Sequence, residues 1–197
     1  LSKIVMKGYL IIVDDNSPDG TGELAEQLAK KYNNIIVIHR PTKLGLGSAY
    51  RQAFQAIFEN MQVDAVFQMD ADLSHDPEFI PSFIETLKNG FDVVVGSRYT
   101  IGGAIEGWPT RRWIISEVAN VLARLLLGMG IRDLTSGFRV YRFDALKSIN
   151  LSEIKSNSYA FQVEMLYHFV NAGFRIGEIP ILFRERGKGN SKLGNSA

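Results

Sequence analysis

The chain has 197 residues, 46% of them hydrophobic and 22% charged, a composition that indicates a folded globular protein and excludes a disordered or fibrous segment. It contains no cysteine, which excludes a disulfide scaffold, a thiolate zinc site and a cysteine nucleophile. Its 22 basic and 21 acidic side chains give a net charge of +1, so net charge predicts no binding to nucleic acid.

Strands and helices are expected to alternate along the first half of the chain. Short apolar runs predict strands that are buried on both faces, at residues 9–13, 35–39, 65–69 and 93–95. Between these runs, apolar residues recur at helical spacing, over residues 24–32, 50–58 and 79–87. This order predicts an α/β fold with a mostly parallel, doubly wound sheet, which binds ligands beyond the carboxyl ends of its strands.

The second half of the chain is less regular. It is expected to form a long amphipathic helix, a short strand, a second helix and a last strand, at about residues 112–127, 138–141, 159–172 and 179–183. The most apolar stretch, residues 113–131, is interrupted by Glu117, Asn120 and Arg124, so it lacks the ~18–20 uninterrupted apolar residues of a membrane span. Its apolar stripe has two interpretations, packing in the core or lying in a membrane interface.

An acidic turn follows the first predicted strand. Asp19 and Thr21 are interpreted as caps of the next helix. Asp14 and Asp15 are adjacent, so their side chains point to opposite faces and only one of them serves easily as a turn or cap residue. The other one is a candidate for binding a ligand.

An Asp-x-Asp pattern, Asp70 and Asp72, follows the third predicted strand. Carboxylates at positions i and i+2 point the same way, and unpaired they repel by about 1 to 4 kcal/mol at about 4 Å. A divalent cation removes that repulsion, and hard oxygen ligands suit Mg²⁺ or Mn²⁺. The alternative is that both are surface acids, while Asp76 caps the helix that begins at Pro77.

Basic side chains supply the complement to these acids. Arg98 directly follows a buried strand, where its planar guanidinium suits bidentate binding of phosphate oxygens. Further cations are either solvated or phosphate-binding: Arg40, Lys43, Arg111, Arg112, Arg184, Arg186, Lys188 and Lys192. Two carboxylates that hold a divalent cation, with arginines close by at the strand ends of an α/β sheet, predict a substrate that carries a diphosphate.

Six motifs in this order resemble the inverting family 2 glycosyltransferases, and within them the dolichyl-phosphate mannose synthases. They are residues 13–21 (VDDNSPDGT), 40–47 (RPTKLGLG), 69–75 (MDADLSH), 95–99 (VGSRY), 135–139 (TSGFR) and 191–194 (SKLG). The resemblance implies the GT-A fold of nucleotide-diphospho-sugar transferases, a Rossmann-like, mostly parallel sheet flanked by helices. It implies one domain over residues 1–197 with a basic C-terminal loop at 184–197. The family's first strand, with its Pro-x-Tyr-Asn-Glu motif, is expected to be missing.

The resemblance also implies an activity, the inverting, metal-dependent transfer of mannose from GDP-mannose to dolichyl or polyprenyl phosphate. The product, dolichyl phosphate mannose, serves glycosylation and GPI-anchor pathways. Mg²⁺ or Mn²⁺ is the implied cofactor, and small membrane subunits are implied partners. The implied location is the cytosolic face of the endoplasmic reticulum in a eukaryote, or the cytoplasmic membrane face in a prokaryote. The alternatives are transfer of glucose or another sugar within family 2, and a non-catalytic nucleotide-binding fragment or subunit.

By position, the resemblance assigns roles to individual residues. Asp15 corresponds to the residue that reads the nucleotide base, and Arg112 and Ser116 fall where the acceptor phosphate is held. The implied donor-binding residues are Val13, Asp15, Asp70, Ala71, Asp72, Arg98, Arg186 and Lys192. The implied metal site is Asp70, Asp72 and Ser74, and the implied catalytic residues are Asp72, Arg98, Arg112 and Ser116. Because a phosphate monoester has its second pKa near 6, the acceptor oxygen is nucleophilic without a general base.

Overall fold

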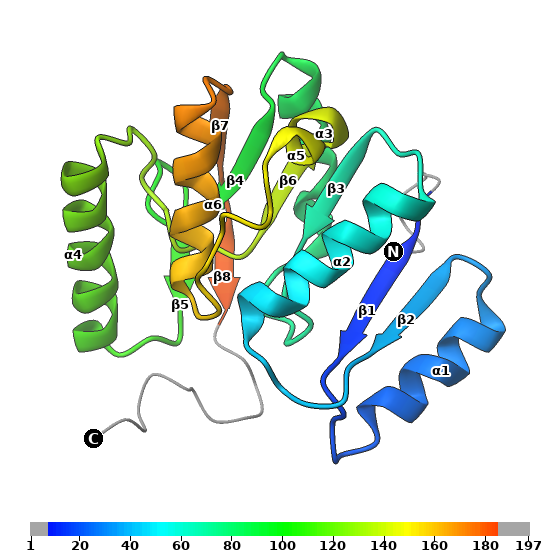
Figure 1. Ribbon diagram of the computed structural model, residues 1–197. Helices are drawn as coiled ribbons and strands as arrows, with labels where there is room; N and C mark the ends of the chain where they lie inside the picture. The colour runs from blue at the N-terminus through cyan, green and yellow to red at the C-terminus, as the bar shows by residue number, and fades with distance from the viewer. Residues whose placement is uncertain (1–7, 185–197) are drawn as a thin grey trace. The chain divides into compact units, whose positions relative to one another are not determined.

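A computed structural model describes residues 8–184, in which helices and strands alternate as predicted (Figure 1). The chain divides into two compact units, which we call unit 1 (residues 1–63 and 150–164) and unit 2 (residues 64–149 and 165–197). The expectation of a single domain over residues 1–197 stays a prediction.

Unit 1 contains a pair of parallel strands, β1 (Leu10–Asp14) and β2 (Ile35–His39). They are joined by α1 (Thr21–Lys31), and α2 (Leu46–Asn60) follows the second strand. The register places Asp14 opposite His39, so the two strands end side by side and the residues that follow them are neighbours.

The first turn of α1 lies close against the end of β1. A Cβ atom at Gly22 would come within 2.6 Å of the Asp14 carboxylate, so this approach requires glycine. Asp19 accepts hydrogen bonds from the backbone N–H and the hydroxyl of Thr21, but the N-cap residue is Gly20 and no side chain caps the helix, so the prediction that Asp19 and Thr21 are its caps is wrong.

The sheet of unit 2 has the strand order β3-β6-β4-β7. Its members are β3 (Ala65–Gln68), β6 (Arg139–Arg142), β4 (Val93–Ser97) and β7 (Ile176–Pro180). β6 runs antiparallel to both of its neighbours, and β4 runs parallel to β7. The other pairings among the described residues, β1 with β2 and β5 with β8, are parallel, so the predicted α/β class with mostly parallel pairing is confirmed.

The single strand expected at residues 179–183 is wrong, because the chain changes partners there. β7 ends at Pro180, and β8 (Leu182–Arg184) pairs with β5 (Ala104–Glu106) in a separate two-stranded sheet. Between them, the Ile181 N–H donates to the Ser97 carbonyl at 3.1 Å, and the Ile181 carbonyl accepts from the Ala104 N–H at 3.0 Å. The apolar pattern runs through this point, so it does not reveal the change of sheet.

The helical segments of unit 2 are η1 (Pro77–Phe79), α3 (Ile80–Lys88), α4 (Thr110–Leu127), α5 (Phe143–Ser148) and the second part of α6 (Ala160–Asn171). Of these, α3 and α5 pack against the four-stranded sheet. Asp76 caps η1 as predicted, accepting the Glu78 N–H at 2.9 Å. The fully buried core side chains include Phe83, Val93, Val94, Val95, Phe138, Val140, Tyr141 and Phe169. Each such side chain contributes about 1.5–3 kcal/mol through its burial.

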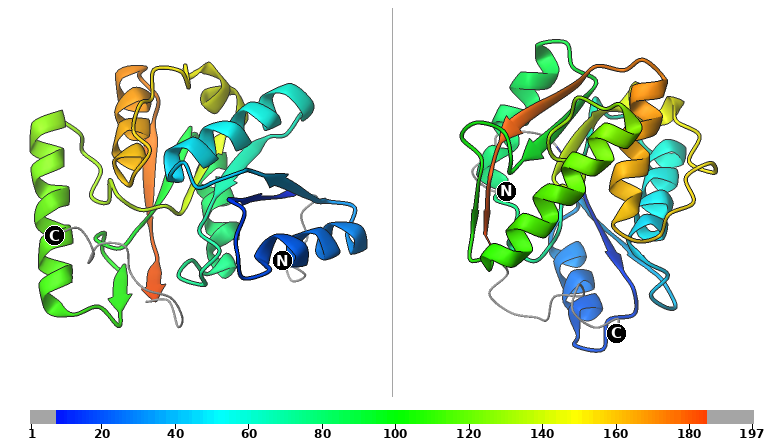
Figure 2. Two further views of the ribbon diagram at one scale, coloured as in Figure 1. Left: turned by 60° about the horizontal axis from the view of Figure 1, so that its bottom comes forward. Right: turned by 90° about the vertical axis from the view of Figure 1, so that its left-hand side faces the viewer.

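The long helix α4 lies at the edge of unit 2 in Figure 1 and in the left view of Figure 2, and it faces the viewer in the right view of Figure 2. Its one buried residue is Asn120. Its large apolar side chains are exposed: Trp113, Ile114, Ile115, Val118, Leu122, Leu125, Leu126 and Leu127. The core-packing interpretation of this stripe is therefore wrong for α4. No helix in residues 8–184 has the length and hydropathy needed to cross a bilayer.

Candidate functional site

The Asp-x-Asp loop of unit 2 is held by short-range hydrogen bonds. Asp72 Oδ1 accepts the Ser74 N–H at 3.1 Å and the Ser74 hydroxyl at 2.5 Å. The Asp70 N–H donates to Nδ1 of His75 at 2.9 Å, so the proton of this neutral ring is assigned to Nε2. Burial lowers the pKa of His75, whose ring stacks on Phe138 with centroids 5.0 Å apart. The loop thus has a buried anchor on one side and half-exposed carboxylates on the other.

The tip of this loop carries backbone strain. Leu73 has a φ of 66° and its side chain is 89% exposed. A bulky residue rarely adopts this left-handed conformation, which costs roughly 1–2 kcal/mol. Strain of this kind is concentrated at functional loops, so it favours a binding role for the segment between Asp72 and Ser74.

The TSGFR motif lies against the Asp-x-Asp loop. A Cβ atom built on Gly137 would sit 3.5 Å from both carboxylate oxygens of Asp70. The last residue of the motif, Arg139, is fully buried and holds the backbone of this segment. It donates to the carbonyls of Ser136 at 2.8 Å and Leu134 at 2.7 Å. The fold therefore brings two motifs together that are about 65 residues apart in sequence.

Arg98 is engaged by an acid that the sequence reasoning missed. Its Nε and Nη2 donate to the two carboxylate oxygens of Asp133, each at 2.7 Å, and Nη2 also donates to the Thr135 hydroxyl at 2.8 Å. Both partners are buried. Burial alone would raise the pKa of Asp133, but the charge and hydrogen bonds of Arg98 outweigh it and hold that pKa below its usual value. The prediction that Arg98 binds a phosphate bidentately through this pair of nitrogens is thus wrong, because Nε and Nη2 bind Asp133 instead. Among its hydrogen bonds to the described residues, none involves Nη1.

Aromatic rings connect Arg98 to the other predicted residues of unit 2. The Phe183 ring contacts His75 at 5.9 Å and Trp108 at 5.5 Å between centroids. The Arg98 guanidinium lies 5.5 Å from the Phe183 ring and 5.4 Å from the Trp108 ring. The Arg112 guanidinium lies 4.1 Å from the same Trp108 ring. Two arginines thus share one indole, an arrangement stabilised by cation–π attraction.

Ser116 joins this group through Tyr99, whose hydroxyl donates to Ser116 Oγ at 2.7 Å. Asn120, one turn further along α4, donates to the Ser116 carbonyl at 2.9 Å and accepts the Leu134 N–H at 2.8 Å. The structure therefore brings Arg98, Arg112 and Ser116 into one network. Burial alone would lower the pKa of Arg98, but the charge and hydrogen bonds of Asp133 outweigh it and raise that pKa, and the charge of Asp70 adds a smaller contribution.

Asp70 and Asp72 form a donor set that suits a hard divalent cation. Residues 8–184 contain no group of three His, Asp or Glu side chains that could hold a metal ion. Mg²⁺ and similar ions are commonly held by one or two carboxylates, with water and substrate phosphates completing the shell. Two carboxylates therefore fit this chemistry, and the Ser74 hydroxyl orients one of them.

The acidic turn of unit 1 separates its two adjacent carboxylates. Asp14 is buried, accepts the Ser17 N–H at 3.3 Å and lies 3.6 Å from Nδ1 of His39. Hydrogen bonds from Ser17 lower the pKa of Asp14. Asp15 instead forms an ion pair with Arg40, at 2.9 Å between Oδ1 and Nε. Asp14 is thus the turn residue, and Asp15 is the one that remains for a ligand.

His39 gives unit 1 a pH-dependent contact. Its Nε2 lies 2.8 Å from Glu26 Oε1, and hydrogen bonding to Glu26, with a smaller contribution from Asp14, raises the pKa of His39 above 6.5. A raised pKa adds stability that is fully present below about pH 6.5 and is lost as the pH rises through the folded value.

We therefore expect His39→Gln to lose a stabilising contribution below about pH 6.5 and to match the wild type more closely at about pH 8.5. Urea unfolding across this range measures the difference, and ring NMR signals report the His39 titration directly. A wild-type His39 that titrates below 6.5 would contradict the assignment. Glu23→Gln is the matched control. Glu23 lies on α1, the helix that also carries Glu26, but it makes no contact with His39.

The remaining predicted residues are placed as follows. Val13 lies in β1 of unit 1, and Ala71 is exposed between the two carboxylates of the Asp-x-Asp loop. Arg186 and Lys192 lie outside the described residues, as does Lys188. The residues that sequence reasoning missed are Tyr99, Trp108, Asn120 and Asp133. Asn120 carried a signal, a polar residue within an apolar helix, whereas Asp133 had none beyond its place two residues before the TSGFR motif.

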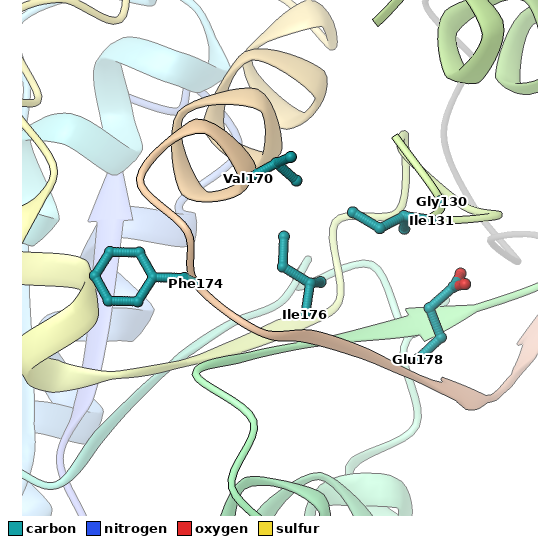
Figure 3. A pocket seen from close by; sticks show the side chains of 6 residues that line it. All are labelled: Gly130, Ile131, Val170, Phe174, Ile176 and Glu178. Carbon is teal, nitrogen blue, oxygen red and sulfur yellow. The ribbon is translucent and has the colours of Figure 1, made fainter. Parts of the chain in front are cut away.

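Unit 2 also has an open cavity of about 310 Å³ (Figure 3). It is lined by Gly130, Ile131, Val170, Phe174, Ile176 and Glu178. The Glu178 carboxylate accepts the backbone N–H groups of Arg132 at 2.9 Å and Asp133 at 3.0 Å. None of the predicted site residues lines this cavity, and its one acid supports the backbone beside Asp133.

Comparison with known proteins identifies relatives by sequence. Residues 9–149 match the description "Glycosyl transferase family 2". The chain is 42% identical over 189 residues to the polyprenol monophosphomannose synthase of Mycolicibacterium smegmatis, covering 95% of this chain and 71% of that protein. It is 42% identical over 193 residues to the undecaprenyl-phosphate mannosyltransferase of Micrococcus luteus, covering 98% and 79%.

Solved structures agree on the fold. The chain is similar to glucosyl-3-phosphoglycerate synthase of Mycobacterium tuberculosis in complex with Mn²⁺, uridine diphosphate and glucosyl-3-phosphoglycerate, with a TM-score of 0.64 and 20% identity. The match covers 94% of this chain and spans 62% of that chain. The complex of the same enzyme with phosphoglyceric acid gives a TM-score of 0.63 at 21% identity, with 93% and 62% covered. These likenesses confirm the GT-A type of fold.

Proposed function

The chain belongs to glycosyl transferase family 2, and from this premise we propose that it transfers mannose from GDP-mannose to a polyprenyl phosphate. The observation that carries the proposal is the network of unit 2, in which His75 and Phe183 connect the Asp-x-Asp loop to Arg98, and Trp108 connects Arg98 to Arg112. Carboxylates can hold a divalent cation that binds phosphate oxygens, and arginines bind phosphate oxygens directly. The two together suit a reaction between two substrates that each carry phosphate. The names of the two curated relatives support the sugar and the lipid acceptor.

The donor is assigned to two sets of residues. In unit 1, Asp15 would accept an N–H of the nucleotide base, and Val13 would line that pocket. In unit 2, Asp70, Ala71 and Asp72 would face the diphosphate. Asp70 and Asp72 would hold a divalent ion, Mg²⁺ or Mn²⁺, which would supply positive charge toward the departing nucleoside diphosphate. Arg186 and Lys192 stay predicted donor contacts.

The acceptor phosphate is assigned to Arg112 and Ser116. Arg112 supplies charge beside Trp108, and the Ser116 hydroxyl is oriented by the donated hydrogen bond from Tyr99. The acceptor oxygen attacks the anomeric carbon, the bond to the nucleotide diphosphate breaks, and the configuration inverts. Since that oxygen is already anionic near neutral pH, the task of the chain is to align the two substrates rather than to remove a proton.

A transfer assay with radiolabelled GDP-mannose and a polyprenyl phosphate tests this function. We expect label to move into the lipid extract in the presence of Mg²⁺ or Mn²⁺. Parallel reactions with UDP-glucose test the alternative of a glucosyltransferase. Binding of GDP in calorimetry without transfer to any lipid phosphate would instead support a non-catalytic nucleotide-binding protein.

The exposed face of α4 is proposed to rest on the membrane that contains the lipid acceptor. Leu125 and Leu126 are 75% and 83% exposed, and Arg111 and Arg124 flank the apolar stripe. The opposite side of the helix carries Ser116 and the buried Asn120. An amphipathic helix with this division suits the interface of a bilayer with anionic lipids.

We expect Leu125→Asp to reduce binding to vesicles of phosphatidylethanolamine and phosphatidylglycerol about tenfold or more. The reason is the loss of about 1.5–3 kcal/mol from one inserted leucine. Flotation with the vesicles measures the bound fraction. Leu24→Asp, at a leucine of α1 that is 58% exposed, is the matched control and should float as the wild type does. Equal flotation of Leu125→Asp and the wild type would exclude α4 as the membrane contact.

A further inference from the structure

Arg40, at the end of β2 in unit 1, has an unusual environment for a charged side chain. Its side chain is only 2% exposed, and its three guanidinium nitrogens are buried without a hydrogen-bond partner among residues 8–184. Arg40 forms an ion pair with Asp15, with Nε 2.9 Å from Oδ1, but the direction of the N–H bond is wrong for a hydrogen bond. Arg40 is thus an ion-pair partner of Asp15 whose five N–H donors make no hydrogen bond to the described part of the chain.

This arrangement lowers stability. Buried polar groups are nearly always hydrogen-bonded, and a buried ion pair commonly contributes less to stability than apolar side chains of similar volume. Neither strand pairing nor the turn needs the guanidinium, because the strand connection at this point uses the Arg40 backbone N–H and the Asp14 carbonyl, 2.8 Å apart. A costly side chain with no structural task indicates a task in binding.

The ion pair with Arg40 restricts the orientation of the Asp15 carboxylate. Oδ1 is buried and faces Arg40, whereas Oδ2 accepts no hydrogen bond from the described residues, and the Asp15 side chain is 25% exposed. A carboxylate held by one oxygen presents the other in a fixed direction.

We propose that Arg40 is a positioning residue for recognition of the donor nucleotide. It holds Asp15 so that Oδ2 accepts an N–H from the edge of the base, as guanine offers at N1 and N2. The proposal rests on the proposed role of Asp15 in binding the donor and adds a residue that acts through it. Arg40 needs no contact with the nucleotide, in keeping with its buried nitrogens.

The test is calorimetry of the whole chain with GDP and Mn²⁺, combined with donor kinetics. We expect Arg40→Met to weaken GDP binding about tenfold or more and to raise KM for GDP-mannose, with kcat at saturating donor unchanged. Its melting temperature should equal or exceed that of the wild type, because an unsatisfied charge is replaced by an apolar chain of similar length. Lys30→Met, which removes an exposed charge from α1, should leave all of these values unchanged.

A double-mutant cycle separates this inference from the proposed function. Asp15→Asn should weaken GDP binding, and adding Arg40→Met to it should change the affinity by less than about twofold, because the two residues act as one unit. A full effect of Arg40→Met in the Asp15→Asn background would overturn the inference, and so would a lower melting temperature with unchanged affinity. Wild-type GDP binding by Asp15→Asn would contradict the proposed function of Asp15 itself.

Discussion

Replacing Asp72 by asparagine is expected to reduce sugar transfer by about 10³-fold, while leaving the fold intact. Loss of one group that stabilises transition-state charge costs about 10²–10³ in rate, and this carboxylate would also hold the cation. Asparagine keeps an oxygen that can accept the Ser74 N–H and hydroxyl, so the loop has no reason to rearrange. Initial rates of mannose transfer across a Mn²⁺ series measure the loss.

Asp76→Asn is the matched control for this experiment. It removes a carboxylate from the same loop, but Asp76 caps η1, and asparagine caps helices as well as aspartate does. We expect it to transfer at close to the wild-type rate. Wild-type turnover by Asp72→Asn, or undiminished turnover of the wild type in EDTA, would remove the cation from the mechanism.

Asp133→Ala is expected to lower the free energy of unfolding by about 3–5 kcal/mol. Removing one partner of a buried ion pair leaves the other as an uncompensated buried charge, and here that charge is the bidentate Arg98. Urea unfolding followed by circular dichroism measures this change. A loss below about 1 kcal/mol would show that Arg98 finds another partner or reaches water.

The double variant Arg98→Met with Asp133→Leu distinguishes charge from packing. Because both charges are removed together, we expect it to recover most of the stability lost in Asp133→Ala. We expect its transfer rate to stay low, by about 10²-fold, because Arg98 is one of the predicted donor-binding residues and Nη1, which Asp133 does not engage, is the nitrogen that would face the phosphates. A stable double variant with wild-type turnover would limit Arg98 to a structural role.

Much of this architecture could be predicted from local patterns. The strands at residues 65–69 and 93–95 are short apolar runs with polar turns at their carboxyl ends, and the structure has β3 and β4 there. The acids and Arg98 stand directly after these strands, so their approximate place in the fold followed from their place in the sequence. The cap at Asp76 followed from its position before Pro77.

The details that sequence reasoning missed depend on contacts between distant segments. The continuous apolar pattern near Ile181 hid a change of sheet that backbone hydrogen bonds to Ser97 and Ala104 impose. The helical periodicity of α4 identified an apolar stripe but not whether anything covers it. Leu125 and Leu126 are exposed because no segment of unit 2 within the described residues packs over that face.

The residue types and their spacing thus determined the fold class and the chemical character of the site, because periodicity, turns and strand ends are local properties of a chain. Only the tertiary structure decided which charges meet. Arg98 pairs with Asp133, 35 residues away, rather than offering its whole fork to a phosphate. Arg40 is buried beside Asp15 because two parallel strands end together. Electrostatic partners and covered faces are set by distances in space, and the spacing of residues along the chain does not specify those distances.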